Sequence, residues 1–591
     1  MKKTPNEYDR VTNAMNPVPQ KMESGNICNI PSGTCISALA QLILICLKDL
    51  CVLNLGMGIP SYFRHLLQRY PHLLKDVSEK TKGNVLLVDF NCLIYGCAKS
   101  TKLPTYTHET REVWEAALIQ EIRSYVLHLW TISGKPEEVV LAVDGVVPMA
   151  KIRQQRLRRF KGIWLAGKEI ELGARTIEYE VWDTNCITPG TAFMDRLEFS
   201  LKDLASTRGW VVSSANEPGE GEQKLMEWVR ARGSEAFAGK HVIVYGLDAD
   251  LILLCMMHAA AGATWSILRE RQEFIKAPLT VQSNRPPCLT MSINGLKEVM
   301  FPDEGTRDAH IRDYIAGMCL LGNDFIPHNV GIHIRDSGHD RLVAALTTIH
   351  SGAGTLIYMD AADGLWKWNR EALLQIVGAW ASTEREDIEH SFKKKYKMRP
   401  QPARSQAEQR MLPLQNLPIE LAEESRIWCR RTGELATEWK TGYYREKRGR
   451  NLTSVEIEEK CAEYLRGLQW NIDYYTGQRA VSSVWMYPWT YAPLWSDLYA
   501  KLAGSERIPQ PLNVNQEAPL RAQEQLSLVL PLESWWLIRD PILKALPSRI
   551  PHFWPSAFEF STIGKRWLWE CPPEIPIIVP SRLRAALVTE Q

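Results

Sequence analysis

Short runs of β-branched and leucine residues alternate with longer, helix-length patterns from residue 57 to about residue 346. The runs lie at residues 85–88, 139–143, 210–213 and 242–245. Strands that alternate with helical segments are typical of parallel sheets whose connections are crossover helices. The pattern therefore predicts an α/β fold with a parallel sheet core and flanking helices.

Three of these predicted strands are followed by aspartate. Asp89 follows the first, Asp144 follows the second, and both Asp248 and Asp250 follow the last. In open α/β sheets, ligands bind outside the carboxyl ends of the strands. One aspartate in such a position is usually a helix N-cap, but three strands that deliver carboxylates to the same edge indicate a site.

Two further acidic segments follow. Glu220 and Glu222 stand in the sequence PGEGE, just ahead of a helical pattern, where glycine allows the backbone to turn tightly. Acidic residues stabilise helix N-termini, which would account for one glutamate but not for the intervening glycine. Asp324 stands in GNDFIP, after an apolar helix that Gly322 could cap; alone, it would be a typical turn residue.

These seven carboxylates come without histidine or cysteine partners. Hard oxygen ligands of this kind favour Mg²⁺ or Mn²⁺ over zinc. So many like charges cannot occupy one cleft unless cations offset them. The chemistry that uses such a cluster is phosphodiester hydrolysis with two metal ions about 4 Å apart.

A basic segment begins directly after Asp144. Lys151, Gln155, Arg158 and Arg159 have the spacing of one helix face, and Pro148 suits the first turn. Arginine offers forked, directional donors to phosphate. A charged stretch is usually a solvated helix face, but the position behind a candidate metal ligand favours a phosphate-binding role.

Composition limits the range of functions. The 591 residues carry 70 Lys+Arg against 68 Asp+Glu, so the net charge of +2 leaves nucleic-acid affinity to local patches. The 13 cysteines, an odd number with none in a C-x-x-C pair, argue against a disulfide framework and against a zinc site. We expect a reduced, intracellular protein, in the cytoplasm or the nucleus.

Residues 1–56 differ from the rest of the chain. Residues 1–35 are polar and patternless, and the apolar stretch at 36–47 is shorter than the roughly 20 residues that a membrane span needs. A secretory signal would place its apolar part nearer the start. We expect Met57 to be the working start and the preceding residues to be an appendage or read-through; a tethering segment or an extra surface helix is the alternative.

The ordered motifs of the chain from Met57 onward resemble the Xrn-type 5′→3′ exoribonucleases. The motifs are MGIPSYFRHLLQRYP (57–71), LLVDFN (86–91), AVDGVVPMAKIRQQRLRRF (142–160), NCITPGTAFM (185–194), NEPGEGEQK (216–224), YGLDADLILL (245–254) and LLGNDFIPH (320–328). The resemblance implies a PIN-like α/β core related to the flap nucleases.

The resemblance also assigns roles to residues. It implies that the metal site, for two Mg²⁺ ions or for Mn²⁺ in their place, consists of Asp89, Asp144, Glu220, Glu222, Asp248, Asp250 and Asp324. It implies that Lys151, Gln155, Arg158 and Arg159 hold a 5′-monophosphate. All eleven residues are present.

The chain departs from the family pattern at several positions. Tyr95 replaces the histidine that stacks on the first base, and Gln223 replaces the histidine that follows the paired glutamates. A phenol ring can still stack on a base. Trp485 is the candidate for the opposing aromatic, although the usual W-x-W reads Ser483-Val484-Trp485 here. We expect most other rings of this Trp- and Tyr-rich region to pack the second region onto the first.

The sequence thus predicts four parts. They are an N-terminal extension (1–56), a nuclease domain (57–350), a helical connection and linker (351–415) and a mainly helical, aromatic-rich second region (416–591) that completes the active site. Within the connection, the basic, Pro- and Gln-rich residues 394–415 predict an exposed linker.

The function expected from these features is that of a monomeric, processive 5′→3′ exoribonuclease. Its substrate would be single-stranded RNA with a 5′-monophosphate, its products nucleoside 5′-monophosphates, and no membrane would be involved. One alternative is a structure-specific flap endonuclease, against which the basic helix and the second region argue. Another is an inactive RNA-binding scaffold. In such a protein we would expect other residues in place of the site carboxylates, whereas all seven are intact.

Overall fold

The computed structural model describes most of the chain from residue 59 onward. The described residues are 59, 61–77, 81–175, 180–271, 287–352, 354–398, 403, 405–416, 422–447, 449–510 and 518–588. The predictions made for residues 1–56 and for Met57 lie outside this part of the chain.

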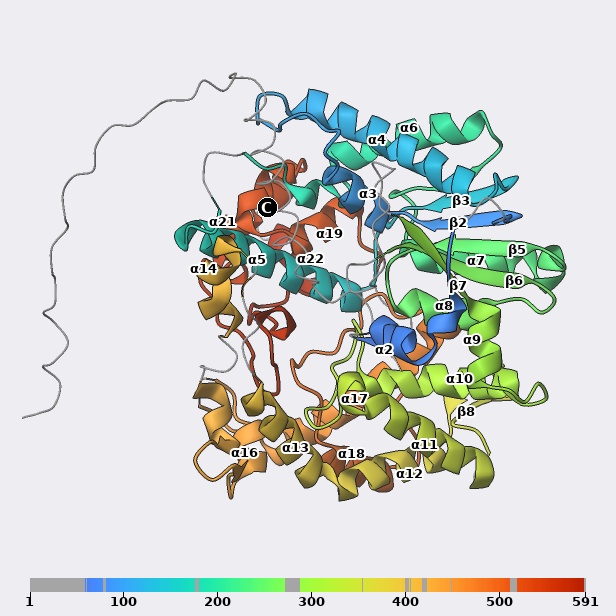
Figure 1. Ribbon diagram of the computed structural model, residues 1–591. Helices are drawn as coiled ribbons and strands as arrows, with labels where there is room; N and C mark the ends of the chain where they lie inside the picture. The colour runs from blue at the N-terminus through green and yellow to red at the C-terminus, as the bar shows by residue number, and fades with distance from the viewer. Residues whose placement is uncertain are drawn as a thin grey trace, which may run out of the picture. The chain divides into compact units, whose positions relative to one another are not determined.

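A seven-stranded sheet forms the centre of the nuclease region (Figure 1). Its strands are β1 (Leu74–Asp76), β2 (Val85–Asp89), β3 (Glu138–Ala142), β4 (Val211–Ser213), β5 (His241–Tyr245), β6 (Thr264–Glu270) and β7 (Cys288–Ser292), in the order β1-β7-β6-β5-β2-β3-β4. Strands β6, β5, β2, β3 and β4 are parallel, whereas β7 runs antiparallel to both β6 and β1. The four predicted strands are confirmed.

The sheet separates two hydrophobic cores. Along β2, Val85 and Leu87 face one core while Leu86 and Val88 face the other, and all four side chains are fully buried. Burial on both faces explains why the strands read as continuous apolar runs rather than as alternating ones.

Helices cover both faces of the sheet. The Leu86 side contains residues of α3 (Asn91–Ala98), α4 (Arg111–Ile132), α6 (Ala192–Ser206) and α19 (Ala522–Val529). The Val85 side contains residues of α2 (Tyr62–Arg69), α7 (Gly221–Arg232), α8 (Asp250–His258), α9 (Ile293–Met300), α10 (Arg307–Met318) and α17 (Ser454–Thr476). The predicted α/β fold with flanking helices is confirmed.

The second region packs directly onto the nuclease region through α17. This helix begins at a capping box between Thr453 and Glu456, and most of its second half is buried. Trp470 stacks on Tyr474 of the same helix with ring centroids 5.4 Å apart, and Phe325 meets both rings edge-on. The expectation that most aromatic rings here serve packing is confirmed.

Further helices surround these elements. They are α11 (Gly338–Gly352), α12 (Arg370–Ser382), α13 (Glu384–Lys397), α14 (Gln406–Gln415), α16 (Trp439–Tyr443), α18 (Trp495–Ala503), α20 (Pro541–Lys544), α21 (Leu546–Arg549) and α22 (Pro580–Val588). Two short hairpins pair β8 (Ile357–Met359) with β9 (Trp366–Trp368) and β10 (Trp428–Cys429) with β11 (Glu434–Leu435).

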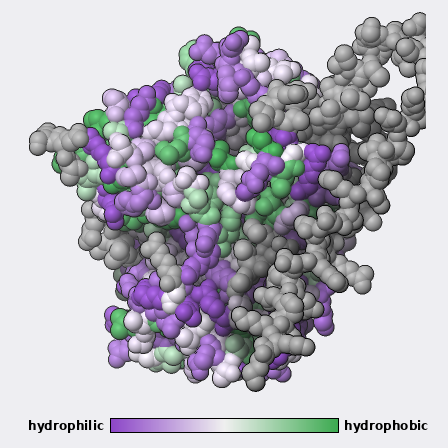
Figure 2. Space-filling model, turned by 90° about the vertical axis from the view of Figure 1, so that its left-hand side faces the viewer, coloured by the Kyte–Doolittle hydropathy of each residue, from purple (hydrophilic) through white to green (hydrophobic). Residues whose placement is uncertain are grey.

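On the face shown in Figure 2, hydrophilic and hydrophobic residues are interspersed, and hydrophilic ones predominate toward the bottom of the view. Among the described residues, none of the helices combines the length and the hydropathy needed to cross a bilayer.

The prediction of an exposed linker at residues 394–415 is wrong for most of the segment. Helix α13 runs to Lys397, and α14 begins after Ser405, whose hydroxyl accepts a hydrogen bond from the Glu408 backbone amide at 3.1 Å. Met411 is buried. The sequence analysis missed these helices because their polar side chains bind residues that are distant in sequence, as in the pairs Lys395–Glu424 and Arg410–Gly173. The boundaries of the four predicted parts stay predictions.

The clearest of these distant partners is Glu424. Its Oε1 lies 2.5 Å from the Nζ of Lys395, and both side chains are 1% exposed. The same carboxylate accepts hydrogen bonds from Tyr396 and from the Gly564 amide. Burial raises the pKa of Glu424, and the Lys395 ammonium opposes that effect.

We expect Lys395→Met to lower the free energy of unfolding by roughly 3 kcal/mol, because it leaves a buried carboxylate without its cation. Lys393→Met is the matched control, since its ion pair with Glu389 on the same helix is exposed and contributes little. Thermal melts of the three proteins test this expectation, and equal midpoints for both variants would contradict it.

Candidate active site

The acidic residues lie where neighbouring parallel strands end. Asp89 is the last residue of β2, Asp144 follows β3, Asp248 follows β5, and Asp250 is the first residue of α8. Since β5, β2 and β3 are adjacent in the sheet, the structure brings these carboxylates to one edge, as the sequence predicts.

Helix α7 adds the two glutamates. Glu220 is its N-cap and Glu222 lies in its first turn. A Cβ at Gly221 would lie 2.7 Å from the Ala142 carbonyl oxygen and 2.8 Å from Asp89 Oδ1, so only glycine allows this close approach. The Gly221 amide donates to Asp144 Oδ1 at 2.7 Å. The expected role of the glycines is confirmed.

Asp324 comes from the turn that follows the short helix after α10. Gly322 has a φ of +84° and ends the short helix at Cys319–Leu321. The Asn323 side chain then accepts hydrogen bonds from the Phe325 and Ile326 amides, which fixes the turn that presents Asp324.

Lys151 is the cation at the centre of the cluster. Its Nζ lies 2.7 Å from Glu220 Oε2 and 3.0 Å from Asp324 Oδ2, and the residue is 9% exposed. Burial lowers the pKa of Lys151, but the surrounding carboxylates outweigh it and hold that pKa well above the usual value. In this structure the Lys151 ammonium thus pairs with the carboxylates of Glu220 and Asp324.

The remaining negative charge is largely uncompensated. Burial, and then the neighbouring carboxylates, raise the pKa of Asp89, Glu222 and Asp250 well above the usual range. Burial is also the main reason that the pKa of Asp248 rises to about 6. The Asp250 side chain is 1% exposed, and its Oδ1 has no hydrogen-bond partner in the described part of the chain. This donor set suits hard divalent cations.

A cavity of about 50 Å³ joins the acidic cluster to helix α5 (Met149–Glu171). It is lined by Asp89, Asp144, Glu220, Glu222, Asp248 and Asp324, by Lys151, Gln155, Arg158 and Arg159, and by Tyr95. Of the thirteen predicted site residues, Asp250 and Trp485 are not among those that line this cavity.

The α5 side of the cavity offers unused donors and acceptors. Gln155 Oε1 and Arg159 Nη1 are buried and lack hydrogen-bond partners among the described residues. Burial lowers the pKa of Arg159 to about 10, so this guanidinium stays charged at neutral pH. Unpaired buried polar atoms of this kind are available to bind a ligand.

Trp485 is not brought to the cavity. It is 4% exposed, its ring lies 5.4 Å from that of Trp470, and its Nε1 donates to Glu463 Oε2 at 3.1 Å. Its side chain packs against Gly467 on α17. The structure gives Trp485 a packing role.

The sequence analysis did not identify two residues of the site, Tyr474 and Asn91. The Tyr474 hydroxyl of α17 donates to Glu220 Oε1 at 3.0 Å and to Glu222 Oε1 at 2.9 Å. The Asn91 side chain donates to Asp144 Oδ2 at 2.8 Å and accepts from the Asp144 amide at 3.2 Å. Asn91 could have been found from its place two residues after Asp89, whereas no local pattern indicates Tyr474.

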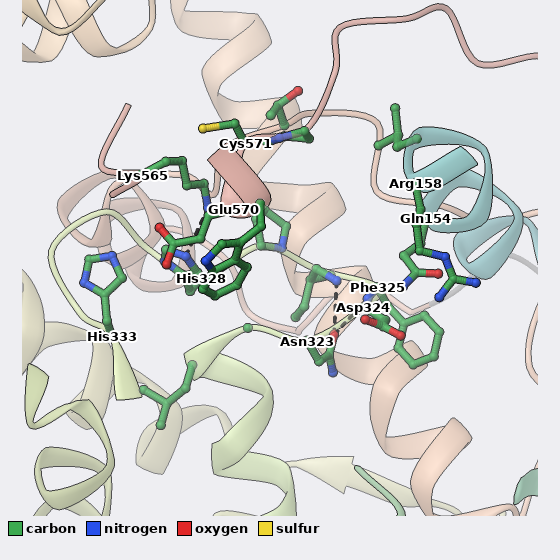
Figure 3. A pocket seen from close by; sticks show the side chains of 18 of the residues that line it. Gln154, Arg158, Asn323, Asp324, Phe325, His328, His333, Lys565, Glu570 and Cys571 are labelled. Atoms are coloured by element: carbon green, nitrogen blue, oxygen red, sulfur yellow. Dashed lines mark hydrogen bonds between the residues drawn. The ribbon is translucent and has the colours of Figure 1, made fainter. Parts of the chain in front are cut away.

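A larger cavity of about 260 Å³ adjoins the first (Figure 3). The two share Gln154, Arg158 and Asp324. On its far side, Lys565 Nζ lies 3.1 Å from His328 Nε2, and Glu570 pairs with Arg335. The two cavities together form a recess alongside α5, in which the acidic cluster lines the smaller cavity and Arg153, Lys161, Arg335 and Lys565 line the larger one.

Comparison with known proteins extends this description. A family model described as the XRN 5′-3′ exonuclease N-terminus matches residues 57–271, and one described as the Xrn1 helical domain matches residues 431–590. The two matches together cover more than half of the chain.

Several curated proteins are similar to this chain, and those described next are named 5′-3′ exoribonucleases. The human 5′-3′ exoribonuclease 1 is 29% identical, covering 90% of this chain and 34% of that protein. The Schizosaccharomyces pombe 5′-3′ exoribonuclease 1 is 26% identical over 90% of this chain and 48% of its own length. The Arabidopsis thaliana 5′-3′ exoribonuclease 2 is 25% identical over 90% and 67%.

The chain therefore spans about a third of the human relative and about half of the fission-yeast one. With both family regions matched in order and the acidic residues gathered at one sheet edge, the chain belongs to the XRN 5′-3′ exonuclease family.

Proposed function

We propose that this chain is a processive 5′→3′ exoribonuclease that converts single-stranded RNA with a 5′-monophosphate into nucleoside 5′-monophosphates. The observation that carries the proposal is the cavity in which an acidic cluster and a cationic helix face meet. The names of the relatives support an exoribonuclease activity. We also propose that it acts as a monomer.

The acidic cluster would hold two Mg²⁺ ions, for which Mn²⁺ could substitute. The fit rests on the all-carboxylate donors, on their mutual repulsion and on the unpartnered Asp250 oxygen. When bound, such ions supply an activated water and offset the charge that develops on the leaving oxygen.

The residues of the chain then position the substrate. The guanidinium groups of Arg158 and Arg159 and the amide of Gln155 line the side of the cavity away from the sheet and would hold the terminal phosphate. Tyr95 lines the same cavity and would stack on the first base. Tyr474 holds the two glutamates of α7 in place by donating to both.

The first test compares RNA with a 5′-monophosphate and RNA with a 5′-hydroxyl. We expect a preference of roughly 10-fold or more for the phosphorylated RNA, since each charge-assisted bond contributes about 1.5–3 kcal/mol. The double variant Arg158→Ala/Arg159→Ala should lose this preference by slowing the phosphorylated substrate. Lys168→Ala, at the exposed end of the same helix, is the control. Equal rates on both RNAs by the unmodified protein would refute the phosphate site.

The second test concerns the acidic cluster. We expect Asp248→Asn to reduce hydrolysis by roughly 100-fold or more, because lost metal ligation removes several kcal/mol of transition-state stabilisation. RNA binding and the thermal midpoint should change little, since the side chain keeps its shape. Chelating the divalent ions should stop the unmodified enzyme, and Mg²⁺ should restore it. A variant with near-normal turnover at saturating Mg²⁺ would remove Asp248 from the site.

The third test separates positioning from metal binding. Burial raises the pKa of Glu220, and the Tyr474 hydroxyl opposes this effect because its hydrogen bond favours the ionised carboxylate. Tyr474→Phe removes this hydrogen bond, raises the pKa, and should move the acidic limb of the pH–rate profile to higher pH. Raising the Mg²⁺ concentration should move the limb back, because metal and proton compete for the carboxylates. Tyr475→Phe, the neighbouring buried phenol, is the control, and the same profile for both variants would contradict this role.

A further inference from the structure

Helices α2 and α11 bring together a second group of potential metal ligands. His65 of α2 and His339 and Asp340 of α11 each offer one ligand atom, and these atoms all lie within 4.8 Å of one another. The two imidazole rings have centroids 4.3 Å apart. None of these residues lines either cavity described above.

One ring nitrogen of each histidine lacks a hydrogen-bond partner among the described residues. His339 is 1% exposed; its Nε2 lies 2.7 Å from the Tyr314 hydroxyl, whereas its Nδ1 is buried without a hydrogen-bond partner among the described residues. His65 Nε2 is likewise buried and unpaired there. An unsatisfied buried nitrogen is destabilising, so two of them side by side require an explanation.

Asp340 completes the group from the solvent side. Its Oδ1 pairs with Arg69 Nη1 at 2.5 Å, and both side chains are about half exposed. An exposed ion pair of this kind contributes little to stability. A metal ion can therefore compete with Arg69 for this carboxylate at small cost.

We propose that His65, His339 and Asp340 bind a zinc ion. Two imidazoles and one carboxylate are zinc ligands, whereas Mg²⁺ prefers oxygen alone. A water molecule would complete a four-coordinate site. The Tyr314 hydroxyl donates to Tyr62, so it can accept a hydrogen bond from His339 Nε2–H, which leaves Nδ1 for the metal and orients the bound imidazole.

Such an ion would join α2 to α11. Ser61, the N-cap of α2, lines the larger cavity, so a metal bound here would stabilise the helix that borders that cavity. The cysteine pattern gives no sign of the site, because its ligands are histidine and aspartate. The proposal does not depend on the proposed exoribonuclease activity.

The test uses the full chain, freed of metal by a chelator and titrated with Co²⁺ and then with Zn²⁺. We expect one equivalent of Co²⁺ to give the intense visible absorption of a tetrahedral site. Zn²⁺ should displace it, whereas excess Mg²⁺ should not, which separates this site from the acidic cluster. Zn²⁺ should also raise the thermal midpoint.

Variants locate the ion. His65→Gln and Asp340→Asn, both at accessible positions, should weaken Zn²⁺ binding at least ten-fold, whereas Arg69→Gln should bind zinc at least as tightly as the unmodified chain. His310→Gln is the control, since His310 stacks on His350 in a separate histidine pair. Absence of a tetrahedral Co²⁺ spectrum, or equal affinity in the His65 and Asp340 variants, would overturn the proposal.

Discussion

The crowding of buried carboxylates at one edge of the sheet is the constraint on which the rest of the structure depends. Strands β2, β3 and β5 and helix α7 can deliver these groups only because Gly221 lets α7 approach the strand ends. Burial, and then mutual repulsion, keep the pKa of Asp89, Glu222 and Asp250 high. Lys151 offsets part of this charge, so the position of α5 is as important to the site as the sheet itself.

The C-terminal part of the chain holds α5 in that position. Arg156 is 1% exposed, and its guanidinium donates to the carbonyls of Leu528, Phe553 and Pro576. Lys161 Nζ donates to the Cys571 carbonyl at 2.7 Å. These buried cations are satisfied by backbone oxygens rather than by acids. The second region is therefore part of the site's framework, and through Tyr474 it also contacts the carboxylates directly.

The sequence predicted the elements whose signal is local. Continuous apolar runs marked β2, β3 and β5, and the acids after them have a topological reason to converge. The glycine between Glu220 and Glu222 correctly indicated a close backbone approach. Helix α14 and the Lys395–Glu424 pair were missed because their stability comes from contacts between residues distant in sequence. Tyr474 and the burial of Trp485 depend on how α17 packs, which no spacing within α17 reveals.

Helix α5 contributes Lys151, Gln155, Arg158 and Arg159 to the lining of the smaller cavity, and Lys151 contacts the acidic cluster directly. An α-helix rises 1.5 Å per residue, so the axial separation between Lys151 and Arg158 is fixed at about 10 Å. A hydrogen-bonded helix held at several buried points cannot stretch or shorten to follow its ligand. Under the proposed function, α5 would fix the distance between the recognised 5′ end of the RNA and the phosphodiester bond that is hydrolysed. The size of each step along the RNA would then be set by backbone geometry rather than by the identity of the base.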